Sequence, residues 1–353
     1  MEKPVIRISV RNLVEFILRN GDLESGGTAG DKEAMLKGSR LHRKIQKQMG
    51  SHYQAEVSLK KDTEYEDLIL RVEGRADGIF TQNEKICIDE IKGVYKNLEL
   101  LAEPVLVHRA QALCYAWIYL DDHGLEEIDV QMTYVHLDTE MIKRFRETMT
   151  REELESWYQR LLDSYHKWLS YQMKWREERN RSMEKLEFPF IYRKGQKEMV
   201  AGIYHAISRK EQIFIQAPTG VGKTMSAVFP AVRSIGEGKA ETLFYLTART
   251  ITRTVAQDAF EILRKNGLLF KTVTITAKEK LCFCEKPECN PETCPYAKGH
   301  YDRINDAVYE LWTNEQSFDR ETILRQAEKW QVCPFEMSLE LSVWMDAVIC
   351  DYN

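Results

Sequence analysis

The segment Ala217–Thr224 has the residue types that bind the phosphates of a nucleotide, in the order Ala-Pro-Thr-Gly-Val-Gly-Lys-Thr. Gly220 and Gly222 allow the backbone to curl so that successive N–H groups point at one phosphate. Lys223 is long enough to reach the β- and γ-phosphates, and the Thr224 hydroxyl is a ligand for Mg²⁺. The segment therefore predicts a site for a nucleoside triphosphate.

The residues on either side predict the two elements that such a loop joins. The apolar run Gln212–Gln216 is typical of a buried strand, and Met225–Ile235 of a helix whose N-terminus adds partial positive charge. The first glycine of the general pattern is replaced by Ala217. In this form the loop resembles the ATP sites of superfamily 2 helicases rather than those of small GTPases or kinases. The resemblance implies ATP and Mg²⁺ as ligands, with Thr219 as part of the site.

A second set of residues has the types that hold a divalent cation. Glu90 and Lys92 project from one face of the strand predicted at Lys85–Ile91, while Asp89 projects from the other face. Asp77, on the preceding strand, adds a second carboxylate, and two carboxylates hold Mg²⁺ or Mn²⁺ through oxygen. The cation lowers the pKa of a bound water, which the lysine would position or activate. Without further context, the same residue types are also common on surface β-hairpins.

The surrounding residues supply that context. His42 lies on a predicted helix, and Gln111 and Tyr115 lie one turn apart on a later one, so they face the same direction. Together with Asp77 and the Glu-x-Lys motif they resemble the PD-(D/E)xK nucleases of the RecB type, over roughly residues 5–138. The resemblance implies that His42, Asp77 and Glu90 are metal ligands, that Lys92 is catalytic, and that Gln111 and Tyr115 support them.

Five of the eight cysteines are concentrated between Cys282 and Cys333. Four thiolates suffice for a 4Fe–4S cluster or a structural zinc, and the spacing is not the paired pattern of a zinc ribbon. One early cysteine, two close ones and a distant one before proline resemble the cluster inserted in helicases of the XPD/DinG type. The resemblance implies Cys282, Cys289, Cys294 and Cys333 as 4Fe–4S ligands, with exchange between Cys282 and Cys284 left open.

Three more segments resemble parts of superfamily 2 helicases. Upstream of the loop, Phe188–Gln196 resembles the segment that reads adenine, which implies a role for Gln196, although a turn that starts a helix is the alternative. After the loop, a strand predicted at Thr242–Leu246 leads into Thr247–Thr250, which resembles the element that grips the DNA backbone. The residues implied there are Thr247, Arg249 and Thr250.

The strand predicted at Ala347–Asp351 ends in the position of a Walker B carboxylate, which implies that Asp351 holds Mg²⁺ through water. Tyr352 stands where the family has the glutamate that polarises the attacking water, and this departure puts ordinary hydrolysis in question. A helicase motor of this class hydrolyses ATP between two lobes. We expect the second lobe in a longer protein, or the chain to be a truncated relative of one.

These residues require an α/β architecture of two domains. We expect a PD-(D/E)xK restriction-endonuclease-like domain at 1–140, a helical linker at 141–185, and one P-loop RecA-like helicase lobe at 186–353 with an α-helical Fe–S insert at about 278–340. The further elements predicted from periodicity are helices at Val10–Leu18, Lys32–Met49, Pro104–Leu120, Met141–Arg181 and Tyr301–Gln331, and strands at Gln54–Leu59, Asp67–Val72, Ala76–Thr81, Asp129–Leu137 and Thr272–Thr276.

Composition sets outer limits on function. The 353 residues are 43% hydrophobic and 30% charged, as in ordinary globular proteins, and no apolar run approaches the length of a membrane span. With no visible secretory leader, we expect a cytoplasmic protein that does not enter the membrane. The net charge of −5 argues against wholesale coating of nucleic acid but allows a local basic groove.

The sequence thus predicts the N-terminal portion of an ATP-dependent DNA helicase-nuclease, with single-stranded or forked DNA as its partner and a role in repair. Its 5′–3′ direction is implied by the resemblance alone. Two alternatives stay open: a stand-alone nuclease with a vestigial ATP lobe, and a non-catalytic Fe–S module that binds DNA or senses redox state.

Overall fold

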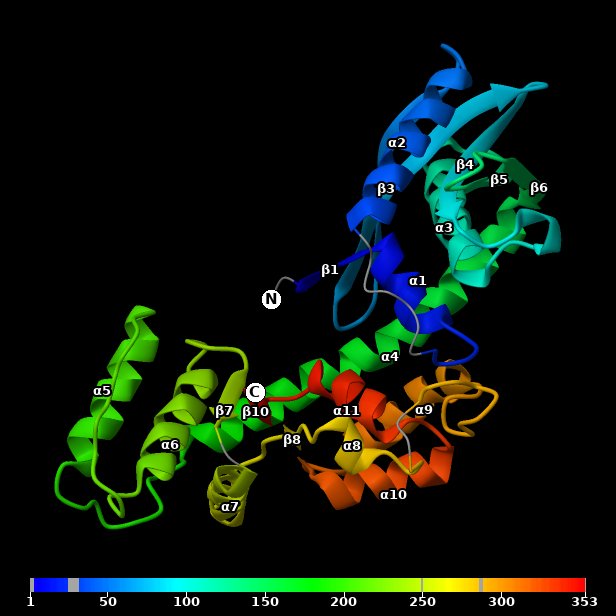
Figure 1. Ribbon diagram of the computed structural model, residues 1–353. Coiled ribbons are helices and arrows are strands. Elements are labelled where there is room, and N and C mark those ends of the chain that lie inside the picture. Colours follow the sequence, from blue (N-terminus) through cyan, green and yellow to red (C-terminus); the bar gives the residue numbers. More distant parts are fainter. Residues whose placement is uncertain (1–2, 25–31, 249, 286–287, 353) are drawn as a thin grey trace. The chain divides into compact units, whose positions relative to one another are not determined.

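The computed structural model describes residues 3–24, 32–248, 250–285 and 288–352 (Figure 1). The chain forms two compact units. The first unit comprises residues 1–20 and 26–168, and the second comprises residues 21–25 and 169–353. The chain therefore passes between the units three times, once on each side of residues 21–25 and once within a long helix.

The first unit is built on a mixed six-stranded sheet. Its strands are β1 (Val5–Ser9), β2 (Gln54–Glu64), β3 (Ile69–Gln82), β4 (Lys85–Val94), β5 (Glu127–His136) and β6 (Ile142–Thr150). They follow the order β1-β3-β4-β5-β6, with β2 paired to β3. Strands β4 and β5 are parallel, whereas β3 and β4 are antiparallel, so the sheet places Asp77 of β3 near the carboxyl half of β4.

Four α-helices and a short 3₁₀ turn accompany this sheet: α1 (Val10–Leu18), α2 (Lys32–Gln48), η1 (Leu98–Leu100), α3 (Leu106–His123) and α4 (Arg151–Glu184). Ser9 caps α1 by accepting a 3.1 Å hydrogen bond from the Asn12 N–H, because a serine oxygen satisfies a free N–H of the first turn. Helix α3 is buried along most of its middle and packs on β4 and β5. It therefore holds Gln111 and Tyr115 rigidly above the sheet.

Strand β3 is continuous, whereas the sequence predicted two strands separated near Gly74. Glycine is required there by close approach rather than by a turn. A Cβ atom at Gly74 would lie 2.7 Å from the Tyr115 hydroxyl oxygen, and one at Gly78 would lie 1.8 Å from the Tyr53 ring. Both glycines thus make room for aromatic side chains on the faces of β3.

The second unit has a four-stranded parallel sheet in the order β7-β10-β8-β9. Its strands are β7 (Leu243–Thr247), β8 (Thr272–Thr274), β9 (Ser317–Phe318) and β10 (Ala347–Asp351). Its helices, besides the end of α4, are α5 (Gln196–Arg209), α6 (Lys223–Gly236), α7 (Thr250–Lys265), α8 (Lys278–Leu281), α9 (His300–Asn314), α10 (Arg320–Trp330) and α11 (Pro334–Ser342). An α/β unit with a parallel sheet fits a RecA-like lobe.

Three more predicted elements differ in the structure. Residues 142–150 form β6 rather than the start of a helix, because their alternation pairs them with β5. The helix predicted at Tyr301–Gln331 is interrupted by β9, which pairs with β8. The strand predicted at Gln212–Gln216 is irregular, and Phe214 is 93% exposed. A strand needs a neighbour for its N–H and C=O groups, and no described strand pairs with this segment.

A buried polar network joins α4 to the sheet of the second unit. Asp346 accepts hydrogen bonds from the Trp175 indole at 2.9 Å, from Arg179 at 2.6 Å and from the Lys271 backbone N–H at 2.8 Å. Burial lowers the pKa of the Lys271 side chain to about 8, and its ammonium donates to the carbonyl oxygens of Trp312 and Glu315. The network fixes the start of β10 and therefore the strand that carries Asp351.

Among the described residues, no helix combines the length and the apolar character needed to cross a membrane.

The close packing on β3 gives a stability prediction. We expect Gly78→Ala to destabilise the first unit by about 1–3 kcal/mol, because the new methyl group overlaps the Tyr53 ring. The matched control is Gly38→Ala in α2, where a Cβ atom meets nothing within 4 Å and helix propensity should add up to about 1 kcal/mol. Urea unfolding measures both variants. Equal midpoints for the two would contradict the assignment of a steric role to Gly78.

Candidate functional site

The side chains predicted for a nuclease site converge within the first unit. His42 of α2 lies 3.4 Å from Asp77, measured from Nδ1 to Oδ1. The other carboxylate oxygen of Asp77 accepts a 2.7 Å hydrogen bond from the Ile91 N–H, which fixes β3 against β4. Lys92 contacts Glu90 at 2.8 Å and donates to Gln111 Oε1 at 2.6 Å. Elements α2, β3, β4 and α3 thus each supply part of one polar cluster.

Glu90 carries the strongest electrostatic signal in this cluster. It is only 4% exposed, and its Oε2 has no hydrogen-bond partner in the described part of the chain. Burial raises its pKa to about 7, Lys92 opposes the rise, and the neighbouring Asp77 adds to it. An unpartnered buried carboxylate oxygen beside a second carboxylate is the donor set that a hard divalent cation fits. The two groups satisfy that chemical test.

Tyr115 and Asp89 have different surroundings. Tyr115 lies over Gly74, and burial raises the pKa of its hydroxyl, with Glu90 as the next cause. Asp89 lies on the other face, where it accepts hydrogen bonds from Tyr53 at 3.0 Å and Thr133 at 2.6 Å. Its oxygens are occupied, so Asp89 is structural whereas Glu90 is available to a ligand.

No group of three or more His, Cys, Asp or Glu side chains has the arrangement of an assembled metal site, within the ranges that the structure describes. At the carboxylate cluster, hydrogen bonds within the protein occupy part of the donor set, since Lys92 holds one oxygen of Glu90 and the Ile91 N–H holds one oxygen of Asp77.

The nucleotide loop has the backbone conformation that its glycines predict. Gly220 and Gly222 adopt φ values of 82° and 81°, which other residues rarely adopt. Gly222 then caps α6, which begins at Lys223. The Lys223 ammonium donates to the carbonyl oxygens of Ala217 and Pro218, both at 2.9 Å. The Lys223 side chain is therefore folded onto its own loop, where an anion could replace the two carbonyl oxygens as its hydrogen-bond acceptor.

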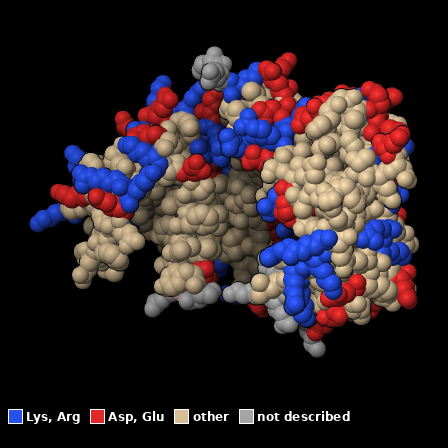
Figure 2. Space-filling view, turned by 90° about the horizontal axis from the view of Figure 1, so that it is seen from above, with Lys and Arg blue, Asp and Glu red and all other residues tan. Residues whose placement is uncertain are grey.

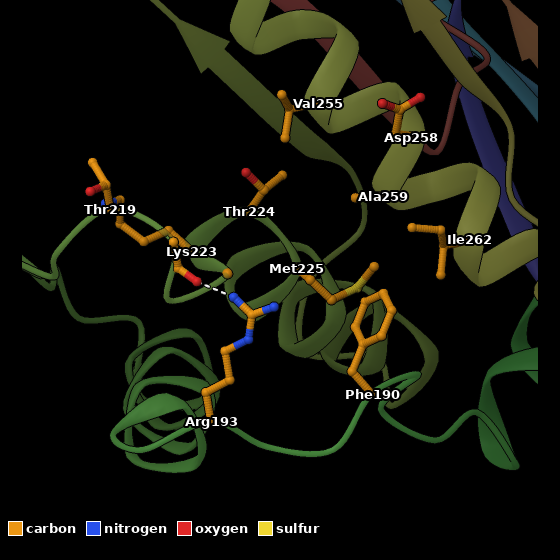
Figure 3. A pocket seen from close by; sticks show the side chains of 12 residues that line it. Phe190, Arg193, Thr219, Lys223, Thr224, Met225, Val255, Asp258, Ala259 and Ile262 are labelled. Carbon is orange, nitrogen blue, oxygen red and sulfur yellow. Dashed lines mark hydrogen bonds between the residues drawn. The ribbon is translucent and has the colours of Figure 1, made fainter.

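This loop borders a cavity of about 460 Å³ (Figure 3). The lining residues of the loop and the start of α6 are Thr219, Gly220, Gly222, Lys223, Thr224 and Met225. Arg193 points at the loop from the preceding segment and donates to the Gly220 carbonyl, and Phe190 lies beside it. Helix α7 closes the opposite wall with Val255, Asp258, Ala259 and Ile262. The volume suits a nucleotide-sized ligand.

Gln196 contacts this loop but does not face the cavity. It is 3% exposed, its Oε1 accepts a 3.0 Å hydrogen bond from the Arg193 N–H, and its Nε2 lies 2.6 Å from where a Cβ atom of Gly222 would be. These contacts match the alternative of a turn that starts a helix, since Gln196 is the first residue of α5. The same contacts also tie the upstream segment to the phosphate loop.

Asp351 ends β10 as predicted, but it is not among the described residues that line the cavity. It accepts a 3.0 Å hydrogen bond from the Thr247 hydroxyl and lies 3.6 Å from Arg253. Thr247 ends β7 and Thr250 begins α7. Arg249, predicted to grip DNA, lies outside the described residues.

The cysteines form a small buried cluster in the second unit. Cys289, Cys294 and Cys333 are 7%, 8% and 7% exposed, and Cys284 packs against them with its Sγ 3.7 Å from that of Cys294. Cys282 is half-buried and interacts with Cys284. Burial raises the pKa of Cys333 to about 11. The fold thus brings together cysteines that are far apart in sequence, although the described residues do not have the arrangement of an assembled metal site.

Several residues around these sites were not identified from the sequence. The α7 wall of the cavity carries no motif, and only folding brings it to the loop. Arg193 and Phe190 lie in the segment Phe188–Gln196 that the sequence predicted to read adenine, but the role there was assigned to Gln196 alone. Leu23, which packs against the cysteines, had no sequence signal at all.

Comparison with known proteins identifies part of the second unit. Residues 193–289 match the DEAD/DEAH box helicase family. The match covers less than half of the chain. It supports a superfamily 2 helicase that hydrolyses ATP and acts on nucleic acid, and such a domain implies ATP and Mg²⁺ as ligands.

Two further comparisons add less. A crystal structure described as that of SSO0001 is 19% identical over 44% of this chain and 75% of its own, with a TM-score of 0.30, too low to bear on the fold. No curated protein matches the chain.

The raised pKa of Glu90 predicts a pH dependence of stability. The native pKa of about 7 exceeds the ordinary value of 4.5, so the native state keeps a proton that the unfolded chain loses between these values. The stabilising contribution is complete below about pH 4.5 and is lost as the pH rises through 7. We expect Glu90→Gln to raise the free energy of unfolding at pH 8 by about 1–3 kcal/mol, with little change at pH 4.5.

Urea unfolding between these pH values tests this expectation. Glu99→Gln, at an exposed glutamate of η1, serves as the control and should follow the wild type at every pH. A Glu90→Gln curve parallel to the wild type would show that Glu90 ionises normally.

Proposed function

We propose that the chain is the N-terminal portion of a DNA helicase-nuclease that couples ATP-driven 5′–3′ unwinding to metal-dependent cleavage of single-stranded DNA in repair. The observation that carries the nuclease half is the convergence of His42, Asp77, Glu90 and Lys92 around an unpartnered carboxylate oxygen. The helicase half rests on the phosphate loop and the DEAD/DEAH box domain.

At the nuclease site, Asp77 and Glu90 would hold Mg²⁺ or Mn²⁺, with His42 as a third ligand. The bound cation supplies a water of lowered pKa and neutralises charge on the scissile phosphate. The protein's own residues orient the reaction. The Ile91 N–H fixes the Asp77 carboxylate, Gln111 holds the Lys92 ammonium, and Lys92 lies where it can position a water or a phosphate oxygen. Tyr115 closes the cluster from α3.

At the ATP site, Lys223 would exchange two carbonyl partners for the β- and γ-phosphates. The phosphates have far more charge than carbonyl oxygens, so the exchange favours the bound state. Thr219, Gly220 and Gly222 offer backbone N–H groups, and Thr224 offers a hydroxyl to Mg²⁺. Gln196 would contact the adenine from the upstream turn, and Asp351 would hold the Mg²⁺ through a water molecule.

DNA contact would follow the end of β7, where Thr247, Arg249 and Thr250 are proposed to meet the backbone. Basic side chains on the face drawn in Figure 2 lie among acidic and uncharged residues. The net charge of −5 also argues against wholesale coating of nucleic acid. A second helicase lobe in a longer protein would complete the motor, and a cytoplasmic location is part of the proposal.

The cysteine cluster would hold a 4Fe–4S centre, with Cys289, Cys294, Cys333 and either Cys284 or Cys282 as ligands. The buried sulfurs and their contact with the Lys278 side chain, whose pKa Cys289 raises, fit an anionic centre. Structural zinc is the alternative for the same thiolates. Iron and sulfide analysis of anaerobically purified protein distinguishes the two.

A stand-alone nuclease with a vestigial ATP lobe is the second candidate. It is favoured by one observation: Asp351 is held by Thr247 and Arg253 and does not line the cavity. Tyr352, in place of the family's glutamate, agrees with it. Cleavage that ATP leaves unchanged would support this candidate.

The nuclease proposal predicts cleavage of labelled single-stranded DNA in the presence of Mn²⁺. We expect Asp77→Asn and Lys92→Ala each to lower the rate at least about 100-fold, since each removes a group from the metal or the water. Lys60→Ala, at an exposed lysine of β2, is the control and should cleave like the wild type. Undiminished cleavage in both site variants would assign the activity to a contaminant or another site.

The ATP site has an independent test. We expect Lys223→Ala to weaken binding of a fluorescent ATP analogue with Mg²⁺ by about 10–100-fold, because a charge-assisted phosphate contact is lost. Lys239→Ala, at a lysine of the same unit that pairs with Glu237, should bind normally. Equal affinity in the two variants would show that the cavity is not the nucleotide site.

A further inference from the structure

A short segment from near the N-terminus folds against the cysteine cluster. Residues 21–25 belong to the second unit, although the chain before and after them belongs to the first. Leu23 is 7% exposed and lies in one apolar cluster with Cys289, Cys294, Ala297 and Cys333. Leu23 is thus the only member of that cluster, among the described residues, that comes from outside residues 284–335.

Four hydrogen bonds hold this segment in place. The Leu23 N–H donates to the Ala297 carbonyl at 2.8 Å, and the Tyr301 N–H donates to the Gly21 carbonyl at 2.9 Å. Two carboxylates add cross-contacts. Asp22 accepts from the Gly299 N–H at 2.6 Å, and Asp302 accepts from the Gly21 N–H at 2.8 Å. Backbone pairing reinforced by two reciprocal carboxylates is a specific contact rather than incidental packing.

We propose that Gly21–Leu23 is a strap that seals the cysteine cluster, and that a centre bound there is retained only while the strap is closed. Leu23 covers the sulfurs with apolar surface and so keeps water and chelators from them. The same strap anchors the connection between α1 and α2, the helix that carries His42. This inference rests on the proposed metal-binding role of the cysteines.

The direct test measures how fast a ferrous chelator removes iron from the full chain, purified anaerobically and loaded with iron and sulfide. We expect Leu23→Asp to lose iron about tenfold faster than the wild type, because truncating or charging a buried leucine opens its site. Leu23→Met should retain iron as the wild type does. Leu100→Asp, at a leucine that is 82% exposed, is the matched control and should also behave as the wild type.

A milder variant guards against misfolding. Asp22→Ala removes only the bond to the Gly299 N–H and should speed iron loss about threefold, roughly the effect of one surface hydrogen bond. Wild-type rates in both Leu23→Asp and Asp22→Ala would overturn the strap.

A chain that binds no iron would contradict the 4Fe–4S proposal but not the strap, which is then tested by thiol labelling. Leu23→Asp should expose Cys289, Cys294 and Cys333 to a thiol reagent about tenfold faster than Leu100→Asp does. Equal labelling in the two variants would overturn the strap.

The anchoring of the α1–α2 connection has its own readout. Trypsin cleaves after Arg19, just before the strap, and the bond should be cut severalfold faster in Leu23→Asp than in the wild type. Equal cleavage rates would overturn the anchoring.

Discussion

The burial of the Glu90 carboxylate is the interaction on which the candidate nuclease site depends. Removing a carboxylate from water is costly unless partners replace its hydration. Lys92 satisfies one oxygen at 2.8 Å, but the other has no partner in the described part of the chain. Protonation relieves this imbalance, as the pKa of about 7 reflects, and a divalent cation would relieve it further. The same burial that destabilises the charged group prepares it for a ligand.

The placement of these side chains was largely predictable because their residues follow local rules. Strand periodicity placed Glu90 and Lys92 on one face and Asp89 on the other, and helical spacing aligned Gln111 with Tyr115. The hydrogen bond between Lys92 and Gln111, and the separate network around Asp89, agree with those faces. By contrast, nothing local showed that Gly74 and Gly78 leave space for tyrosines from other elements. Such packing depends on residues that are distant in sequence.

The nucleotide loop shows the same division. Its glycines allow the tight backbone turn of the loop without help from distant residues, and Gly220 and Gly222 have the positive φ angles that this turn needs. The strand predicted at Gln212–Gln216 fails because a strand is a property of a pair, and hydrophobic pattern alone does not supply a neighbour. The α7 wall was missed for a related reason, because its apolar residues also serve as an ordinary helix face. Sequence therefore predicted the chemistry of the loop better than the shape around it.

The cysteine cluster shows which features of a site sequence spacing can and cannot supply. The sequence showed that enough cysteines are present for a centre and which segment contains them. It did not decide between Cys282 and Cys284, because that choice depends on loop geometry. In the structure, the Sγ of Cys284 lies 3.7 Å from that of Cys294. Leu23 lies far from every cysteine in sequence and carries no polar group, so no motif could reveal it. Only the structure shows its contact, together with the backbone hydrogen bonds that join Gly21 to Tyr301 and Leu23 to Ala297. The chain leaves the first unit at residue 21 and returns to it at residue 26. Between these points, the hydrogen bonds of Gly21 and Leu23 hold the segment in the second unit.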